Sequence, residues 1–257
     1  MNANGSTPVL ALKGVSKSFG PVEALSDVDF EVQPAEVVAL VGDNGAGKST
    51  LVKTIAGIHT ADSGTISFEG QEVHITNPTD AVALGIATVY QDLALCDNLD
   101  VVENLFLGRE ETGEGPARVL HQLDEVEMEK ETGALLENLA VTITDVRNEV
   151  GTMSGGQRQQ VAIARSLLGE PKLVMLDEPT AALGVRQTAQ VLQLIKGLRE
   201  RGYGVVVISH NLADVFQVAD RIYVLRLGRK AGEFGRDASQ EQVVAAITGA
   251  SGNGGKQ

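Results

Sequence analysis

The feature that most constrains this chain is a glycine-rich segment directly after a short apolar run. Residues 37–41 are all apolar, and a helical spacing of apolar residues follows at 51–56. The segment between them reads Gly42, Asp43, Asn44, Gly45, Ala46, Gly47, Lys48, Ser49, Thr50. A buried strand, a glycine-rich turn ending in Gly-Lys-Ser and a helix form the context in which a loop binds phosphate groups. The alternative, a flexible turn between a strand and a helix, explains this context less well.

The residue types of this loop suit a polyphosphate. Its glycines leave room for the backbone and permit turn angles that a side chain would forbid, so successive N–H groups can point inward. The positive end of the following helix adds to the attraction. Lys48 can supply a mobile charge to the β- and γ-phosphates, Ser49 a hydroxyl ligand for Mg²⁺, and Thr50 a further hydrogen bond. The loop therefore predicts a bound nucleotide.

Composition narrows the possible partners. The chain has 257 residues and a net charge of -13, from 34 acidic residues against 21 Lys plus Arg. This balance argues against a broad nucleic-acid footprint and against direct adhesion to anionic lipid. The one cysteine, Cys96, cannot form an internal disulfide, which fits a reducing cytosol. No segment approaches the roughly 20 apolar residues that span a bilayer, and no signal peptide is recognisable, so we expect any membrane role to act through a partner.

Strand and helix patterns alternate over most of the chain, which is typical of α/β organisation. The start of the chain, at 9–12, has the pattern of an edge strand, and helical periodicity replaces strands from about 92 to 165. In that stretch Asp100 and Glu103 have the spacing of a capping box. We interpret it as an inserted helical subdomain of a single domain at 9–250. Residues 1–8 and 251–257 are expected to be a flexible N-terminus and a disordered tail.

Side chains that could bind a metal ion or take part in catalysis follow two further predicted strands. Asp177 and Glu178 follow the apolar strand at 172–176. Asp177 can hold the Mg²⁺ shell, and Glu178 can accept a proton from an attacking water or orient it. His210 follows the next strand, where it either contacts the γ-phosphate and holds the water or is an ordinary neighbour of a helix cap. Acids at strand ends also occur on ordinary loops, but the phosphate loop earlier in the chain favours the functional interpretation.

A third segment has the form of a serine-capped helix start. Ser154, Gly155, Gly156 and Gln157 precede an apolar helical pattern and leave the helix N-terminus bare. Such an end attracts anions, although every ordinary N-cap offers something similar. Because one loop already binds the phosphates, a second anion site needs a second phosphate source or a second subunit.

Taken together, residues 9 to about 247 resemble the ATP-binding cassette of ABC transporters. The matching segments are the Walker A loop at 42–50, the Q-loop at Gln91, the signature motif at 154–157, Walker B with its following glutamate at 173–178, and the switch histidine at His210. The signature motif separates this family from other P-loop proteins. The resemblance implies an ATPase with a RecA-like α/β core, an antiparallel β subdomain and the helical subdomain at about 92–165.

The resemblance also implies how the site is completed. Two cassettes would pack head to tail as a homodimer, so that Ser154 and Gly156 of one subunit meet the γ-phosphate held by Lys48 of the other. Phe19 stands where the family places an aromatic that stacks on adenine, although it could equally belong to the core. Gln91 would sense Mg²⁺ and the γ-phosphate and couple the helical subdomain to a membrane subunit.

The chain departs from the family pattern after Walker B. Gly184 follows Leu183, where the family usually has an aspartate. The polar contact across the dimer that is assigned to this aspartate is then either absent or supplied by the backbone.

Finer resemblance points to the transported molecule. Residues 42–45, 89–95 and 178–185 are similar to cassettes of bacterial monosaccharide importers, especially those for fructose or related simple sugars. This implies a membrane permease, a periplasmic or extracellular sugar-binding protein and a place on the cytoplasmic face of the bacterial inner membrane. An exporter ATPase shares the same catalytic motifs. A soluble ABC protein acting on ribosomes or DNA is the other alternative, disfavoured by the negative charge and the absence of a heptad run.

Overall fold

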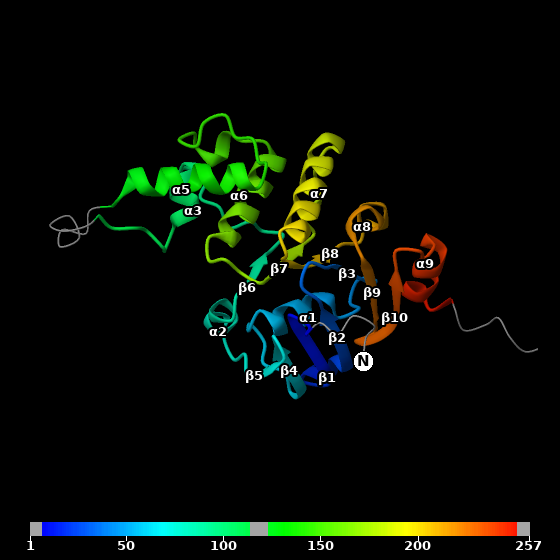
Figure 1. Cartoon of the computed structure of the whole chain (residues 1–257). Coiled ribbons are helices and arrows are strands. Elements are labelled where there is room, and N and C mark those ends of the chain that lie inside the picture. The colour runs from blue at the N-terminus through cyan, green and yellow to red at the C-terminus, as the bar shows by residue number, and fades with distance from the viewer. Residues whose placement is uncertain (1–6, 114–122, 251–257) are drawn as a thin grey trace, which may run out of the picture. The chain divides into compact units, whose positions relative to one another are not determined.

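The computed structural model describes residues 7–113 and 123–250 and is drawn in Figure 1. These residues form two compact units. The first holds the chain up to Gln91, Pro171–Pro179 and the chain from Leu198 on, and the second holds Asp92–Glu170 and Thr180–Gly197. The second unit begins where we expect the helical subdomain, extends beyond residue 165 and adds a segment after Walker B. Most of the predicted N-terminal segment and all of the predicted tail lie outside the described residues.

One sheet of the first unit is antiparallel. Its strands are β2 (Val22–Val32), β1 (Leu10–Phe19), β4 (Ser63–Phe68) and β5 (Gln71–Val73), in this spatial order. The prediction of an edge strand at 9–12 is wrong, because β1 pairs with β2 on one side and with β4 on the other. Alternation of buried and exposed residues identifies the face of a strand that packs on the core, and it says nothing about how many neighbours the strand has.

The second sheet has the order β10, β9, β3, β8, β7, β6. All neighbours pair in parallel except β10, which lies antiparallel to β9 at the edge. The bounds are β3 Val37–Val41, β6 Ile86–Val89, β7 Leu173–Asp177, β8 Gly204–Ile208, β9 Arg221–Arg226 and β10 Arg229–Gly235. β3 and β8 are buried at every residue, which is why they read as continuous apolar runs. Because the carboxyl ends of parallel strands meet at one edge, the segments after β3, β6, β7 and β8 gather there.

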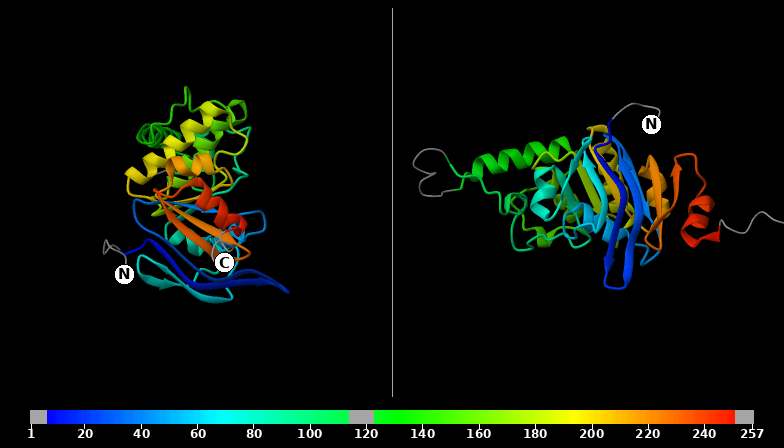
Figure 2. Two further views of the ribbon diagram at one scale, coloured as in Figure 1. Left: turned by 90° about the vertical axis from the view of Figure 1, so that its right-hand side faces the viewer. Right: turned by 90° about the horizontal axis from the view of Figure 1, so that it is seen from below.

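Helices α1 (Lys48–Ile55), α2 (Pro78–Ala83), α8 (Leu212–Val218) and α9 (Gln240–Thr248) belong to the first unit. In Figure 2, α9 in red lies beside the orange strands β9 and β10, which it contacts. We predicted neither β10 nor α9 from the sequence. A local signal for α9 was present, because Ser239 and Gln242 form a capping box at its start and Gly249 ends it at a φ of +76°.

The second unit consists of helices. They are α3 (Val101–Phe106), α5 (Glu125–Asn138), a 3₁₀ turn at Val150–Thr152, α6 (Gly155–Leu167) and most of α7 (Val185–Glu200). The predicted capping box is confirmed: the Glu103 N–H donates to Asp100 at 2.8 Å, and the Asp100 N–H donates to Glu103 at 2.9 Å. Within the described residues no helix is both long enough and apolar enough to cross a bilayer.

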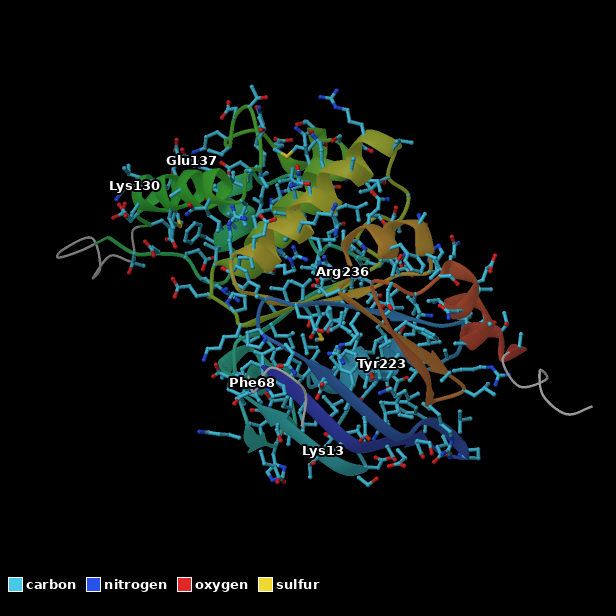
Figure 3. All side chains as sticks on the ribbon, turned by 45° about the vertical axis from the view of Figure 1, so that its right-hand side comes forward. Lys13, Phe68, Lys130, Glu137, Tyr223 and Arg236 are labelled. Atoms are coloured by element: carbon cyan, nitrogen blue, oxygen red, sulfur yellow. The ribbon has the colours of Figure 1, made fainter. Side chains whose placement is uncertain are left out.

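Two side chains of β9 bind the free edge of β2 and so join the two sheets of the first unit. The Tyr223 hydroxyl, labelled in Figure 3, donates to the Asp29 carbonyl at 2.7 Å. The Arg221 guanidinium donates to the Glu31 carbonyl at 2.8 Å and to both carboxylate oxygens of Glu36 at 2.8 and 3.0 Å. Burial raises the pKa of Tyr223, so its hydroxyl remains a donor at neutral pH. This arrangement occupies backbone groups that an edge strand would otherwise expose.

Tyr223→Phe tests this junction. The substitution keeps the ring in place and removes the donor to the Asp29 carbonyl, so we expect a loss of about 1 kcal/mol in the free energy of unfolding. Urea unfolding followed by circular dichroism measures it. Tyr203→Phe is the matched control, because among the described residues the hydroxyl of this partly exposed tyrosine has no hydrogen bond. Equal stability of the two variants would contradict a structural role for the Tyr223 hydroxyl.

Candidate nucleotide-binding site

The loop between β3 and α1 requires glycine for two separate reasons. Gly42, Gly45 and Gly47 have φ angles of +155°, +77° and +103°, which other residues rarely adopt. In addition, a Cβ at Gly42 would lie 2.2 Å from the Leu225 carbonyl oxygen, and one at Gly47 would lie 2.6 Å from that of Ala24. The three glycines therefore expose backbone at the turn, which suits a bound phosphate.

The side chains of the loop divide into structural and exposed groups. Ala46 is buried, and its carbonyl accepts the Gly228 N–H at 3.0 Å. This hydrogen bond fixes the loop to the turn between β9 and β10. The Lys48 ammonium donates to the carbonyls of Gly42 and Asp43 at 2.7 and 3.0 Å. The polar side chains of Asp43, Asn44 and Ser49 are exposed, and Thr50 is partly exposed. The Lys48 ammonium and the Ser49 hydroxyl therefore lie at the same turn.

Asp177 lies at the tip of β7 in a partly buried position. Burial raises the pKa of its carboxyl group, and the neighbouring Glu178 raises it further, while the charges of Lys48 and Lys53 act in the opposite direction. The carboxylate is therefore within electrostatic reach of the phosphate-loop lysine. A carboxylate and the Ser49 hydroxyl are oxygen donors of the kind that Mg²⁺ takes in small numbers, together with water and phosphate oxygens. The residues present fit this ion.

Glu178 and His210 lie in direct contact. The His210 Nδ1 lies 2.8 Å from Glu178 Oε1, and the side chains are 73% and 16% exposed, respectively. The Glu178 N–H donates to the Ile208 carbonyl at 2.9 Å, and Glu178 has a φ of +50°, in the left-handed region. A residue without glycine's freedom in this region stores roughly 1 kcal/mol of strain, a feature that clusters at functional sites. The imidazole and the carboxylate therefore bind each other directly, and the polar atoms that this contact leaves over can bind a water molecule.

Phe19 ends β1 with 44% of its surface exposed, so the alternative that it belongs to the core is wrong. The His59 ring meets it edge-on at a centroid distance of 4.9 Å, and the Lys17 ammonium lies 5.7 Å from the ring centroid. Asp62 holds this corner by accepting from Lys17 at 2.6 Å and from the Ser18 N–H at 2.7 Å. We did not select His59, Lys17 or Asp62 from the sequence, because ring contacts between distant residues have no spacing signature.

Gln91 is exposed and is the last residue of the first unit before the chain enters the second. It follows β6 by one intervening residue, Tyr90. Burial raises the pKa of the Tyr90 hydroxyl, and the Asp177 carboxylate contributes in the same direction. The end of β6 and the tip of β7 are therefore electrostatic neighbours, as the parallel pairing of these strands requires.

The signature segment lies in the second unit and starts α6. Ser154 caps this helix through a capping box with Gln157. The Gln157 N–H donates to Ser154 Oγ at 3.3 Å, and the Ser154 N–H donates to Gln157 Oε1 at 3.1 Å. Gly155 is partly buried. Gly156 is buried, and a Cβ there would lie 2.8 Å from the Cβ of Gln187 on α7. Glycine at this position therefore permits the close approach of α6 and α7.

Gly184 uses both of its main-chain groups inside its own unit. Its N–H donates to Gln187 Oε1 at 3.0 Å, and its carbonyl accepts the Thr188 N–H at 2.9 Å. The residue thus caps α7. The polar contact across a dimer that the family assigns to an aspartate here is either absent or supplied by the backbone. Because both backbone groups of Gly184 already have partners, the structure favours its absence.

In the parallel sheet, the glycine loop follows β3 and the carboxylates stand at the end of β7, with β8 between the two strands. This arrangement defines a P-loop nucleotide-binding protein. The sequence pattern of the family described as ABC transporter matches residues 25–181. The chain belongs to this family, as its motifs predicted.

Named relatives support the assignment over most of the chain. The fructose import ATP-binding protein of Rhizobium meliloti is 45% identical over 95% of both chains. The xylose/arabinose import ATP-binding protein of Sulfolobus acidocaldarius is 47% identical over 86% of both. A ribose import ATP-binding protein of Escherichia coli O157:H7 is 41% identical over 90% of this chain, which spans only 44% of that protein.

Solved structures confirm the predicted fold class. The ADP conformation of an ATP-binding cassette of an ABC transporter matches with a TM-score of 0.80 and 28% identity, over 95% of this chain and 96% of that one. A dimeric cassette in a post-hydrolysis state, bound to ADP and phosphate, matches with a TM-score of 0.71 and 27% identity, over 90% and 100% of the two chains.

Two glycine substitutions separate steric from conformational requirements in the loop. Gly45→Ala meets no atom within 4 Å, so we expect only the cost of its φ of +77°, about 1–2 kcal/mol of stability. Gly42→Ala adds a clash with the Leu225 carbonyl, and we expect a much lower melting temperature or no soluble protein. Differential scanning calorimetry compares the two. Similar melting temperatures would contradict the close approach.

Proposed function

We propose that the chain is the ATP-hydrolysing, energy-coupling subunit of an importer for a monosaccharide, fructose or a related simple sugar. The observation that carries the sugar assignment is the similarity over nearly full length to import ATP-binding proteins for fructose and for xylose or arabinose. The observation that supports hydrolysis is the paired Glu178 and His210 at the strand edge that also carries the phosphate loop.

In this proposal the loop at 42–50 binds ATP through its backbone N–H groups. Lys48 leaves its loop carbonyls to meet the β- and γ-phosphates, and Thr50 adds a hydrogen bond. Phe19 stacks on adenine, which its exposed ring and the orthogonal His59 support. Asp43, Asn44 and Ala46 shape the turn between the glycines.

Ser49, Asp177 and Gln91 are the proposed residues around Mg²⁺. When bound, the ion neutralises charge on the β- and γ-phosphates. A cation there also relieves the cost of burying the Asp177 carboxylate beside Glu178, which is the physical origin of the raised pKa of Asp177.

Hydrolysis needs a water in line with the γ-phosphate. Glu178 orients this water and accepts its proton, and His210, fixed to Glu178 at 2.8 Å, holds the γ-phosphate and the water. The bond from the water oxygen to the γ-phosphorus forms as the bond to the bridging oxygen of ADP breaks. Gln91 contacts Mg²⁺ and the γ-phosphate in this proposal. Its position therefore depends on the bound nucleotide and couples the site to the helical segment that follows it.

The site is completed by a second copy of the chain. Ser154, Gly155, Gly156 and Gln157 of one subunit meet the γ-phosphate held by Lys48 of the other, in a head-to-tail homodimer with two equivalent sites. The N-terminus of α6 begins with two glycines, Gly155 and Gly156, and its positive end supports this role as a second anion site. The structural match to a dimeric cassette bound to ADP and phosphate supports the arrangement.

In this proposal the sugar itself is bound and carried across the membrane by other proteins. The chain binds an integral membrane permease as a peripheral subunit on the cytoplasmic face of the bacterial inner membrane, and a periplasmic or extracellular sugar-binding protein delivers the sugar to that permease. The net charge of -13 supports the expectation of no nucleic-acid partner.

Glu178→Gln tests the general-base assignment. The amide keeps the shape of the side chain and cannot accept the proton, so we expect kcat for ATP hydrolysis to fall by roughly 10² to 10⁴ while ATP affinity is kept. Phosphate release and nucleotide titration measure the two quantities. Glu72→Gln, on the exposed strand β5, is the matched control and should hydrolyse ATP normally. Near-normal turnover of Glu178→Gln would remove this residue from the role.

Copurification tests the transporter assignment. Tagged Glu178→Gln protein is isolated with ATP from gently solubilised native membranes, and mass spectrometry identifies what accompanies it. We expect a polytopic permease, whose sugar-binding protein can then be screened with simple sugars. Ribosomes or DNA-bound proteins without a permease would overturn the proposal.

A further inference from the structure

His59 lies in the turn that follows α1 and is partly buried. Its imidazole meets the Phe19 ring at a centroid distance of 4.9 Å and an interplanar angle of 73°. Aromatic rings favour this arrangement, because the positive edge of one ring meets the negative face of the other. Within residues 7–113 and 123–250 the imidazole nitrogens make no hydrogen bond or ion pair. The contact with Phe19 therefore accounts for the position of this side chain.

The turn that carries His59 has little freedom to move. Gly57 has a φ of +76°, and a Cβ there would lie 2.2 Å from the Asn77 carbonyl oxygen. The His59 N–H donates to the Lys53 carbonyl at 3.2 Å. Because Lys53 belongs to α1, the imidazole is fixed to the same helix that begins at Lys48 of the phosphate loop.

The backbone next to Phe19 is held by the same turn. Asp62 accepts the Ser18 N–H at 2.7 Å and the Lys17 ammonium at 2.6 Å. Asp62 thus fixes the main chain that leads to Phe19, and His59 fixes the ring, of which 44% of the residue's surface stays exposed. A ring that is oriented before a ligand arrives saves the entropy cost of ordering it on binding.

The exposed ring lies near the phosphate loop along β2. Phe19 pairs with Val22 across the turn between β1 and β2. Two residues further on, the Ala24 carbonyl oxygen lies 2.6 Å from the position of a Cβ at Gly47. Two residues of strand span about 7 Å. A nucleotide bound through its phosphates can therefore bring its base to the ring.

We propose that His59 is a positioning residue, which holds the Phe19 ring in the orientation that stacks on the base of the bound nucleotide. This inference rests on the proposed function, because it requires a nucleotide in the loop. Stacking of a base on an aromatic side chain contributes substantially to affinity, and a ring free to change rotamer loses part of that contribution. His59 acts on the base alone in this role, so the binding of phosphate groups should not depend on it.

Equilibrium titration with two ligands separates these effects. In His59→Ala we expect the Kd for ATP with Mg²⁺ to rise roughly threefold to tenfold, as the loss of an aromatic pair implies, and the Kd for inorganic tripolyphosphate to stay unchanged. His74→Ala, at an exposed histidine of the same unit, is the matched control and should keep both affinities. Equal weakening of both ligands in His59→Ala, or an unchanged affinity for ATP, would overturn the positioning role.

Two further variants test whether the edge-on ring is what matters. His59→Phe keeps a ring beside Phe19, so it should restore the affinity for ATP to that of the unsubstituted chain. His59→Leu fills the space without a ring, should weaken ATP binding as His59→Ala does, and replaces that variant should it fail to fold. A phenylalanine variant as weak as the leucine variant would contradict the role of the ring contact.

A double-mutant cycle tests whether His59 acts through Phe19. In a Phe19→Ala background, His59→Ala should cause no further loss of ATP affinity, because the ring that it positions is gone. Losses that add in the double variant would mean that His59 acts on the nucleotide by another route, and the positioning role would be wrong.

The unsubstituted chain separates this inference from the proposed function. If it binds neither ATP nor tripolyphosphate, the proposed function is refuted. If it binds and hydrolyses ATP while His59→Ala keeps the same affinity, only the positioning role is refuted. The contact itself is checked without nucleotide by proton NMR, where Phe19→Leu should shift the His59 imidazole resonances as the ring current is lost, and unchanged resonances would refute the contact.

Discussion

The close approach of the glycine loop to two main-chain carbonyls is the constraint on which the first unit depends. The loop passes within reach of Ala24 on β2 and of Leu225 on β9, at distances that leave no space for a Cβ at Gly47 or Gly42. Gly228 completes the contact, because it donates to the Ala46 carbonyl and accepts the Ser26 N–H at 2.8 Å. The antiparallel sheet, the parallel sheet and the phosphate loop therefore meet at one point, and none of them can shift without the others.

What could be predicted from the sequence is what is encoded locally. The buried strand before the loop, the capping box at Asp100, the serine cap at Ser154 and the carboxylates at the tip of β7 each depend on neighbouring residues, and the structure contains them all. The two neighbours of β1, the edge strand β10 and the support of Phe19 by His59 depend on segments far apart in the chain.

The acidic groups at the strand edge are electrostatically unfavourable in the protein alone. Asp177 and Glu178 are adjacent and partly buried. Burial raises the pKa of Asp177, and the charge of Glu178 raises it further. Lys48 and Lys53 offset only part of this cost. A site that is electrostatically unfavourable by itself gains more from binding a nucleotide with its metal ion than a neutral site would, which is a common reason for strain at functional positions.

The helix α6 is fastened at both ends, which bears on the missing aspartate at Gly184. At its start, Gly156 packs against Gln187, and the same Gln187 side chain caps Gly184, so the beginnings of α6 and α7 form one contact. At its end, Arg165 holds the carbonyls of Leu93 and Ala94. A short helix with both ends fixed moves as a rigid body, because bending it would break hydrogen bonds inside a packed unit. In the homodimer that we propose, Gln187 already fixes the start of α6 beside Gly184, and no carboxylate is needed for that purpose.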